Sequence, residues 1–204
     1  MSARGKFVTL EGVDGSGKST HLGFVEQLLR RRGLDVLCTR EPGGTPLAEA
    51  LRALVLGTPM DGVCEALLMF AARADHVRQV IRPALEAGRW VVCDRFTDAT
   101  LAYQGAGKGV STQLIHALAD AAHPGLRPDV TLVFDCPYEV ADARLKQTGR
   151  TMDRFEREDR AFFERVRGAY RESARREPDR VRLIDAAQAV PDVKRKLQQI
   201  ISTL

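Results

Sequence analysis

The sequence predicts an α/β fold with a parallel sheet enclosed by helices, and two observations support this prediction. Five short apolar runs alternate with longer helical patterns along the 204-residue chain, an order typical of right-handed crossovers between parallel strands. The apolar runs are nearly continuous rather than alternating with polar residues, as expected of strands covered on both faces. The predicted strands are Lys6–Leu10, Asp35–Thr39, Trp90–Cys93, Val130–Phe134 and Val181–Ile184.

The segments between these runs carry apolar residues at steps of three and four, the period of a helix with one buried face. Ser19–Arg32 is the first such helix and ends at Gly33, and Val63–Glu86 keeps the period throughout. Phe155–Ala174 combines an apolar stripe with a dense charged face, and a last helix covers about Pro191–Ile201. The predicted loops are Glu41–Pro46, Gly105–Ser111, His123–Asp129 and Gln147–Asp153.

Composition favours a chain that buries a real core. The apolar content is 44% and the net charge is +4, a small excess that suits small anionic substrates as well as it suits nucleic acid. We expect one domain over residues 1–204 with a mobile lid at about residues 147–154, a short basic stretch between two helices. No apolar run approaches the roughly 18 residues of a membrane span. The cysteines lack Cys-x-x-Cys spacing, so we expect reduced core thiols in a cytoplasmic protein.

The strongest functional signal is the segment from Gly12 to Ser19, which matches G-x-x-x-x-G-K-[ST] between a predicted strand and a predicted helix. Its glycines let backbone N–H groups point at phosphate oxygens, and the following helix adds its positive dipole end. Lys18 supplies a charge for the outer phosphates, and Ser19 offers its hydroxyl to Mg²⁺. A chance glycine-rich turn is the alternative, but every fixed position and both flanking elements are present. The motif therefore predicts ATP or GTP binding.

Two further features favour phosphoryl chemistry. Asp94 and Arg95 directly follow a predicted strand, at the sheet edge where a carboxylate meets Mg²⁺ and an arginine can grip a second phosphate. The alternative is a salt-bridged strand end. The basic stretch with Arg150 and Arg154 would close over the moving phosphoryl group, because arginines stabilise the charge that spreads over it. The alternative there is a solvated basic surface.

Several stretches, in this order and spacing, resemble the bacterial thymidylate kinase family over nearly the whole chain. They are residues 10–20, 39–45, 69–73, 94–96, 102–105 and 153–156. The resemblance implies a P-loop nucleoside monophosphate kinase fold with a five-stranded parallel sheet. It also implies a cytoplasmic homodimer that transfers the γ-phosphoryl group of Mg-ATP to dTMP, giving dTDP for DNA precursor synthesis.

The resemblance assigns site residues by position. ATP-binding residues are Gly12, Val13, Asp14, Gly15, Ser16, Gly17, Lys18, Ser19, Thr20 and Arg144. Residues implied for dTMP are Asp14, Glu41, Phe70, Arg73, Arg95, Thr100, Tyr103 and Gln104. The implied metal ligands are Ser19 and Asp94, and the implied catalytic residues are Lys18, Asp94, Arg95, Arg150 and Arg154.

Four of these residues have implied roles in recognising dTMP, the phosphoryl acceptor. Asp14 is similar to the acid that meets the 3′-hydroxyl of dTMP, and Arg95 to the arginine that reaches the acceptor phosphate. Phe70 and Arg73 resemble an aromatic stack and a donor to a thymine carbonyl, on one face of a helix. Core packing of Phe70, with Met69 in the stacking place, is the alternative.

Two positions bear on specificity and on the source of catalytic arginine. Tyr103 resembles a residue whose ring leaves no room for a 2′-hydroxyl; a half-buried aromatic on a helix face is the alternative. Some thymidylate kinases carry an Arg in the P-loop at the place of Gly15. The glycine here implies that the lid supplies the catalytic arginines, Arg150 and Arg154.

Two rival functions stay open at this point. One is a kinase for another nucleotide or nucleoside, although Asp14 and Arg95 favour a phosphorylated deoxy acceptor. The other is a nucleotide switch or a nucleic-acid-binding P-loop protein, which would need a guanine-reading Asn-Lys-x-Asp or a large basic stripe. The sequence has neither. We therefore expect ATP and dTMP as ligands, and no nucleic-acid or membrane partner.

Overall fold

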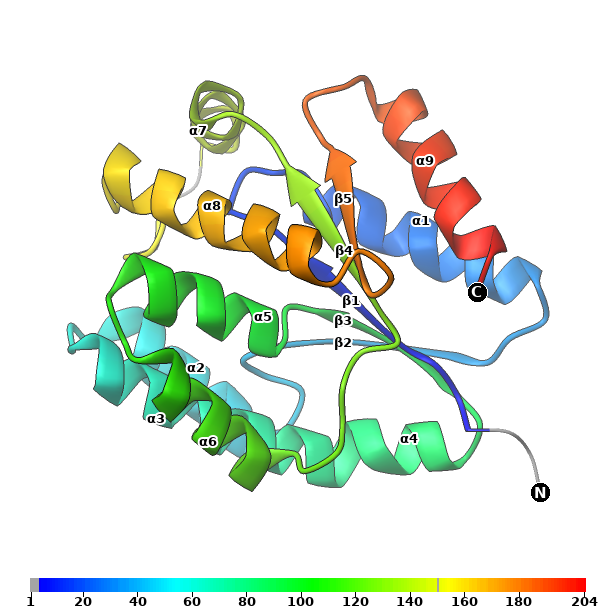
Figure 1. The fold of residues 1–204 in the computed structure, drawn as a ribbon, viewed down its shortest axis with the longest axis horizontal. Helices are drawn as coiled ribbons and strands as arrows, with labels where there is room; N and C mark the ends of the chain where they lie inside the picture. Colours follow the sequence, from blue (N-terminus) through cyan, green and yellow to red (C-terminus); the bar gives the residue numbers. More distant parts are fainter. Residues whose placement is uncertain (1–3, 150) are drawn as a thin grey trace.

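The computed structural model describes residues 4–149 and 151–204, and a parallel sheet lies at its centre (Figure 1). Within those residues five strands lie in the order β2-β3-β1-β4-β5, and every neighbouring pair is parallel. This confirms the predicted fold class and each predicted strand. The strands are β1 (Phe7–Glu11), β2 (Val36–Arg40), β3 (Trp90–Asp94), β4 (Val130–Asp135) and β5 (Val181–Asp185).

Helices form most of the connections, and α1 and α9 pack side by side over one face of the sheet (Figure 1). No helix in the described part of the chain has the length and apolarity to cross a membrane. The α-helices are α1 (Lys18–Arg31), α2 (Pro46–Gly57), α3 (Gly62–His76), α4 (Arg82–Glu86), α5 (Thr97–Thr100), α6 (Thr112–Ala122), α7 (Tyr138–Gln147), α8 (Arg160–Arg176) and α9 (Val190–Ser202). Two π-helical segments, η1 (Val77–Ile81) and η2 (Leu101–Gly107), follow α3 and α5.

The core follows from the alternation of side chains along each strand. In β1, Val8 belongs to the apolar cluster that holds Val25 of α1 and Leu197 of α9. The preceding residue, Phe7, packs on the opposite face with Ile81 of η1. Both faces of β1 are therefore buried, which explains why the strand sequences are apolar throughout.

The helix predictions need corrections. Val63–Glu86 is helical throughout, as predicted, but π-helical bonding in η1 separates the α-helices α3 and α4. Pro83 accounts for the change, since its ring nitrogen cannot donate an i−4 bond and the helix widens to a π turn before it. The helix predicted from Phe155 begins later, at Arg160, where the Asp159 carboxylate accepts a hydrogen bond from the Phe162 amide at 2.7 Å.

Three helices, α2, α5 and α6, are absent from the predicted set, α7 is the helix expected before the basic stretch, and the loop predicted from Gly105 is helical as far as Gly107. For α2 the sequence does hold a signal. The Thr45 side chain accepts a hydrogen bond from the Ala48 amide at 3.1 Å, and Pro46 occupies the first turn. A capping threonine followed by proline is typical of a helix start.

Candidate active site

Functional side chains gather at the carboxyl ends of β1, β2 and β3, the edge of a parallel sheet where ligands bind. The loop of residues 12–17 follows β1, Glu41 follows β2, and Arg95 follows β3. Backbone bonds join the three segments: the Arg95 amide donates to the Leu10 carbonyl and the Glu41 amide donates to the Asp94 carbonyl, both at 2.9 Å. The sheet thus brings together residues that are far apart in the sequence.

The loop after β1 has the backbone that its glycines predict. Gly12 has a φ of +132°, and a Cβ there would lie 2.4 Å from the Phe134 carbonyl oxygen, so no side chain fits. Behind the loop, Lys18 is buried and donates to the carbonyls of Gly12 at 3.1 Å and Val13 at 3.3 Å. Burial lowers the pKa of Lys18. The ammonium therefore lies under the loop, bonded to two of its backbone carbonyls.

A cleft opens in front of this loop, and Arg144 of α7 forms its opposite side. The Arg144 guanidinium donates to the Ala186 carbonyl at 2.9 Å and to the Ser16 carbonyl at 3.4 Å, so it joins the loop to the chain after β5. Of the predicted ATP residues, Gly12 and Val13 do not line this cleft. The others do, namely Asp14, Gly15, Ser16, Gly17, Lys18, Ser19, Thr20 and Arg144, together with His21, Leu145, Gln147, Thr148, Glu156, Ala186, Gln188 and Val190.

A second cleft contains most residues predicted for dTMP. Of that set, Asp14, Glu41, Arg73, Arg95, Thr100, Tyr103 and Gln104 line it, with Pro42, Arg52, Leu56, Met69, Ala99, Asp153 and Phe155. Asp14 lines both clefts. The two clefts therefore meet at this carboxylate.

Phe70 is the predicted dTMP residue that the second cleft does not include. Its side chain is buried at 3% exposure in the apolar cluster with Ala66 and Ile115, and its ring lies 4.6 Å from the Arg73 guanidinium carbon. Met69 lines the cleft instead. Phe70 is thus packed in the core in this structure, and Met69 is the one of the two that borders the cleft.

Arg73 is a buried cation, and one of its three guanidinium nitrogens has no hydrogen-bond partner among the described residues. Its Nε donates to Glu41 Oε2 at 2.6 Å and one terminal nitrogen donates to Thr100 Oγ1 at 3.2 Å. The other terminal nitrogen is buried without a partner among the described residues. Burial alone would raise the pKa of Glu41, but Arg73 and His76 outweigh it and lower that pKa. An unpartnered buried donor is costly, so it marks a place for an acceptor atom of a ligand.

Arg95 lies where the two clefts meet. Its φ of +71° is left-handed, a conformation that costs a residue other than glycine about 1–3 kcal/mol. Its guanidinium donates to Asp14 Oδ1 at 2.6 Å and to the Gly12 carbonyl at 3.0 Å, while the Tyr103 hydroxyl donates to Asp14 Oδ2 at 3.0 Å. Burial alone would raise the pKa of Asp14, but Arg95 and Lys18 lower it to about 2. The carboxylate is therefore charged at neutral pH.

The predicted metal ligands line one further hollow, beside the P-loop helix. Ser19 and Asp94 both border it, and Asp94 Oδ1 is buried without a partner among the described residues. A carboxylate and a hydroxyl are hard oxygen donors of the kind that Mg²⁺ accepts when phosphate oxygens and water complete its shell. These two residues fit such an ion.

The predicted lid arginines have a different outcome. Arg150 lies outside the described residues. Arg154 donates from Nε to the Val55 carbonyl at 2.6 Å, and its NH2 lies 2.6 Å from Glu65 Oε1. Val55 and Glu65 belong to α2 and α3, so in this structure Arg154 is directed at those helices and not at the cleft in front of the P-loop.

Two buried acids near the site, Glu65 and Glu11, were missed at the sequence level. Both have 0% exposure. For Glu65 a signal existed, since Glu65, Met69 and Arg73 are four residues apart and share one helix face. For Glu11 the signal was a carboxylate ending an otherwise apolar strand. His21 also lines the cleft in front of the P-loop. No sequence motif pointed to this residue.

Known proteins are similar to this chain over its whole length. A family model described as thymidylate kinase matches residues 10–197. Thymidylate kinase of Bordetella pertussis is 54% identical over 204 residues, which cover 100% of this chain and 98% of that relative. Thymidylate kinase of Cupriavidus necator is 52% identical over 203 residues, 98% of this chain and 100% of the relative. The crystal structure of thymidylate kinase from Ehrlichia chaffeensis matches with a TM-score of 0.78 at 32% identity, covering 98% of this chain and 99% of that one. The chain therefore belongs to the thymidylate kinase family.

Proposed function

We propose that the two clefts hold the two substrates of one phosphoryl transfer, ATP in front of the P-loop and dTMP between α2, α3 and η2. As a member of its family, the chain phosphorylates dTMP with ATP, giving dTDP and ADP. The observation that carries the assignment is that Asp14 lines both clefts. Donor and acceptor phosphates placed in these clefts would meet beside that residue.

The transfer needs positioning and charge neutralisation more than covalent help. An oxygen of the dTMP phosphate attacks the γ-phosphorus of ATP, and the bond from that phosphorus to the bridging oxygen of ADP breaks. Lys18 faces the outer phosphates of ATP from under the P-loop, while Arg95 holds the acceptor phosphate. Both cations stabilise the charge that spreads over the moving group.

Mg²⁺ is the proposed metal, held with ATP by the Ser19 hydroxyl and the Asp94 carboxylate. The free, buried Oδ1 of Asp94 supports this assignment. When bound, the ion would neutralise charge on the outer phosphate oxygens. The chain's own part is to keep these two oxygen ligands beside Lys18.

Recognition of dTMP is assigned to the second cleft. The unpartnered nitrogen of Arg73 would donate to a thymine carbonyl, with Met69 packed on the base. Asp14 would accept from the 3′-hydroxyl. The Tyr103 ring, which packs edge-on against Phe155 at 5.9 Å, would leave no room for a 2′-hydroxyl.

The Arg73 assignment predicts a change in acceptor binding. Arg73→Lys keeps a cation for Glu41 but removes the forked donor, and we expect KM for dTMP to rise about 10- to 30-fold with a smaller change in kcat. Release of ADP from Mg-ATP would be measured with dTMP, dUMP, dCMP, dAMP, thymidine and no acceptor. Arg78→Lys is the matched control, because that side chain is 77% exposed on the next helical turn. An unchanged KM in Arg73→Lys would contradict the assignment.

We further propose that residues 1–204 work as one domain whose lid, at about residues 147–154, closes over ATP. On closure Arg154 would leave Glu65 and join Arg150 at the transferring phosphoryl group. Closure would also exclude water and so limit hydrolysis of ATP. A cytoplasmic location is proposed because Cys38, Cys64, Cys93 and Cys136 are all free thiols.

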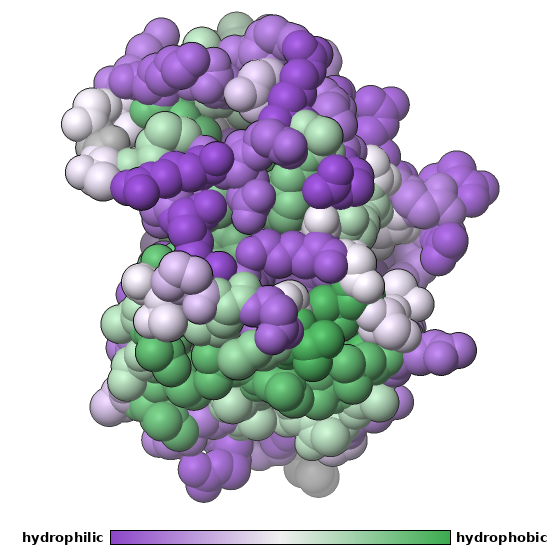
Figure 2. All heavy atoms as spheres, turned by 90° about the vertical axis from the view of Figure 1, so that its left-hand side faces the viewer, coloured by the Kyte–Doolittle hydropathy of each residue, from purple (hydrophilic) through white to green (hydrophobic). Residues whose placement is uncertain are grey.

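A homodimer is the proposed assembly, and the exposed apolar face of α2 and α3 supports it. Leu47 and Leu54 of α2 are 53% and 45% exposed, and Val63 and Leu67 of α3 are 45% and 49% exposed. Figure 2 shows apolar residues gathered over the lower part of this side of the molecule, where α2 and α3 lie in Figure 1. A contiguous patch of this kind is typical of an interaction surface.

The dimer proposal predicts a shift in mass in solution. Leu67→Lys would place a charge in the centre of the apolar face, so we expect a monomer where the wild type is a dimer. Sedimentation velocity would measure the difference. Leu183→Lys is the control, because Leu183 is similarly exposed, at 39%, but lies on β5. A monomeric wild type, or a dimer that survives Leu67→Lys, would contradict this interface.

A further inference from the structure

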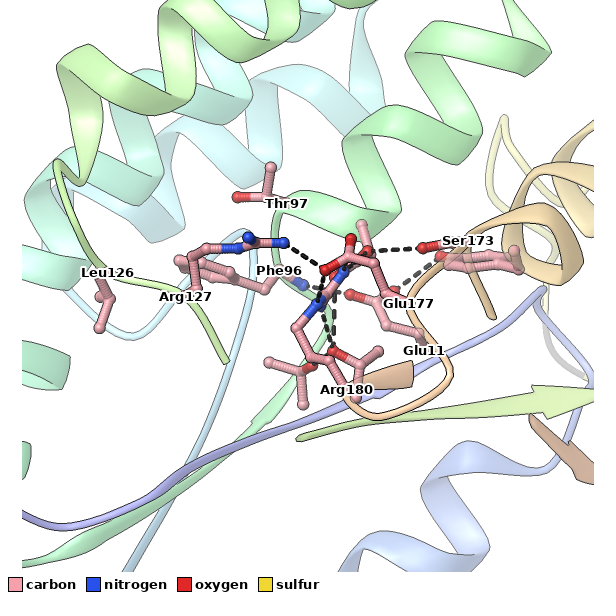
Figure 3. Close-up of polar contacts among 12 residues, drawn as sticks. Glu11, Phe96, Thr97, Leu126, Arg127, Ser173, Glu177 and Arg180 are labelled. Atoms are coloured by element: carbon pink, nitrogen blue, oxygen red, sulfur yellow. Dashed lines mark hydrogen bonds and ion pairs between the residues drawn. The ribbon is translucent and has the colours of Figure 1, made fainter. Parts of the chain in front are cut away.

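Glu11, the last residue of β1, is a buried carboxyl that lines neither substrate cleft. It has 0% exposure. Its Oε1 accepts a hydrogen bond from the Phe96 amide at 2.7 Å, and its Oε2 accepts one from the Tyr170 hydroxyl at 2.8 Å. Figure 3 shows Glu11 reaching from β1 to Phe96. Each oxygen of the carboxyl therefore has its own partner.

Both contacts of Glu11 lead to the same residue, Arg95. Phe96 is its neighbour in the chain, so Glu11 fixes the peptide that follows Arg95, while the Leu10 carbonyl fixes the Arg95 amide at 2.9 Å. The Tyr170 hydroxyl in turn accepts from the Arg95 guanidinium at 3.4 Å. Two successive residues of β1, Leu10 and Glu11, thus hold Arg95 from both sides.

Arg95 needs such support because its φ of +71° is left-handed. A residue other than glycine keeps this conformation only where surrounding contacts fix it. The conformation matters for function, since the backbone turn at Arg95 determines where the guanidinium enters the second cleft, beside Asp14. Because the side chain is long, a rotation at this point would move its charged end away from Asp14.

A role in packing alone does not account for Glu11. Burial, with the nearby Asp98 charge, raises the pKa of Glu11 to about 8, so the carboxyl is held at a cost that an apolar residue would avoid. The nearby cation Arg180 is engaged elsewhere, because it binds Asp98 at 2.8 and 2.9 Å. It also binds Glu177 at 3.0 Å, and Figure 3 shows these two side chains together. The hydrogen bonds described for Glu11 go to Phe96 and Tyr170.

We propose that Glu11 is a positioning residue for phosphoryl transfer, which holds the backbone turn of Arg95 through the Phe96 amide and steadies the guanidinium through Tyr170. The proposal rests on the role given to Arg95 above. It predicts that changes at Glu11 act on the acceptor through Arg95 and leave ATP binding as it is.

Three variants separate the two contacts. Glu11→Gln keeps an acceptor for the Phe96 amide and a polar partner for Tyr170, and we expect kcat/KM for dTMP within about threefold of the wild type. Glu11→Met has a similar volume but loses both contacts, and we expect a fall of about 10- to 100-fold. Tyr170→Phe loses the hydroxyl alone, and we expect a fall of about fivefold. KM for ATP should change by less than about twofold in all three.

A double-mutant cycle with Arg95→Ala is the decisive test. If Glu11 acts through Arg95, Glu11→Met and Tyr170→Phe cause no further loss once Arg95 is alanine. The same fold-loss in both backgrounds, or an equal rise in KM for ATP, overturns the positioning role. Tyr170→Phe opens no large cavity, so its arm of the cycle still tests the Tyr170 contact with Arg95 if Glu11→Met does not fold.

The two proposals fail in different ways. If Arg95→Ala alone leaves the kinetics for dTMP unchanged, the proposed role of Arg95 is wrong and the positioning role falls with it. If Arg95→Ala is severely impaired while the Glu11 effects are additive to it, Arg95 keeps its role and the positioning role alone is wrong.

Discussion

Replacing Arg95 with alanine is expected to lower kcat/KM for dTMP by about 10³-fold, the lower end of what an arginine at a transferring phosphoryl group contributes. Arg95 is held by Asp14 at 2.6 Å and by the Gly12 carbonyl at 3.0 Å, so it is already in place before the acceptor arrives. Its removal would also leave the half-buried Asp14 carboxylate without its ion-pair partner. Arg95 lines the acceptor cleft and not the cleft in front of the P-loop, so KM for ATP should change less than the kinetics for dTMP.

Steady-state kinetics with dTMP varied at saturating Mg-ATP would measure this loss. Arg95→Lys should recover only part of the activity, because an ammonium cannot grip two oxygens in the way a guanidinium does. The control is Arg175→Ala, which removes a side chain that is 75% exposed on α8. Wild-type turnover in Arg95→Ala would remove Arg95 from the mechanism.

Replacing Lys18 with alanine is expected to lower kcat by about 10²–10³-fold, since it removes a preorganised charge from the transferring group. Lys18 is 5% exposed and bonds only the carbonyls of Gly12 and Val13 in the described residues. Its ammonium is therefore free to turn to phosphate oxygens without breaking an ion pair. ADP lacks the γ-phosphate, so its affinity for the variant should fall by a smaller factor than kcat does.

Single-turnover phosphoryl transfer and ADP titration by calorimetry would separate these two effects. Lys196→Ala on α9 is the control, because it removes an exposed lysine. If kcat is retained and only ADP affinity falls, Lys18 binds nucleotide without taking part in the transfer.

The strands were predictable because burial on both faces leaves an unbroken apolar run. Each predicted strand nevertheless ends one residue before the observed one, at Glu11, Arg40, Asp94, Asp135 and Asp185. A hydrophobic pattern excludes these charged residues, but the ladder hydrogen bonds are made by the backbone and continue through them. These charged residues, which the hydrophobic pattern excludes, lie at the carboxyl edge of the sheet, where ligands bind.

The candidate site was predictable where a motif fixes geometry and not where packing decides. The P-loop needs its glycines and Lys18 at set positions, so the sequence alone specifies it. The choice between Met69 and Phe70 depends on which side of α3 faces η2, and both residues continue the same apolar pattern. The partner that Arg154 finds, Glu65, is 89 positions away in the sequence, and no local pattern reports such a pairing.

The strand order also determines when the site can exist during folding. β1 lies between β3 and β4, which follow it only after long intervening segments, so its ladders close large loops. The entropy of closing those loops opposes pairing until most of the sheet assembles together. During the early steps of folding, the P-loop therefore lacks its neighbours in the site, including Arg95 and the chain segment that follows β5. ATP should consequently stabilise the finished fold by mass action while leaving the folding rate nearly unchanged.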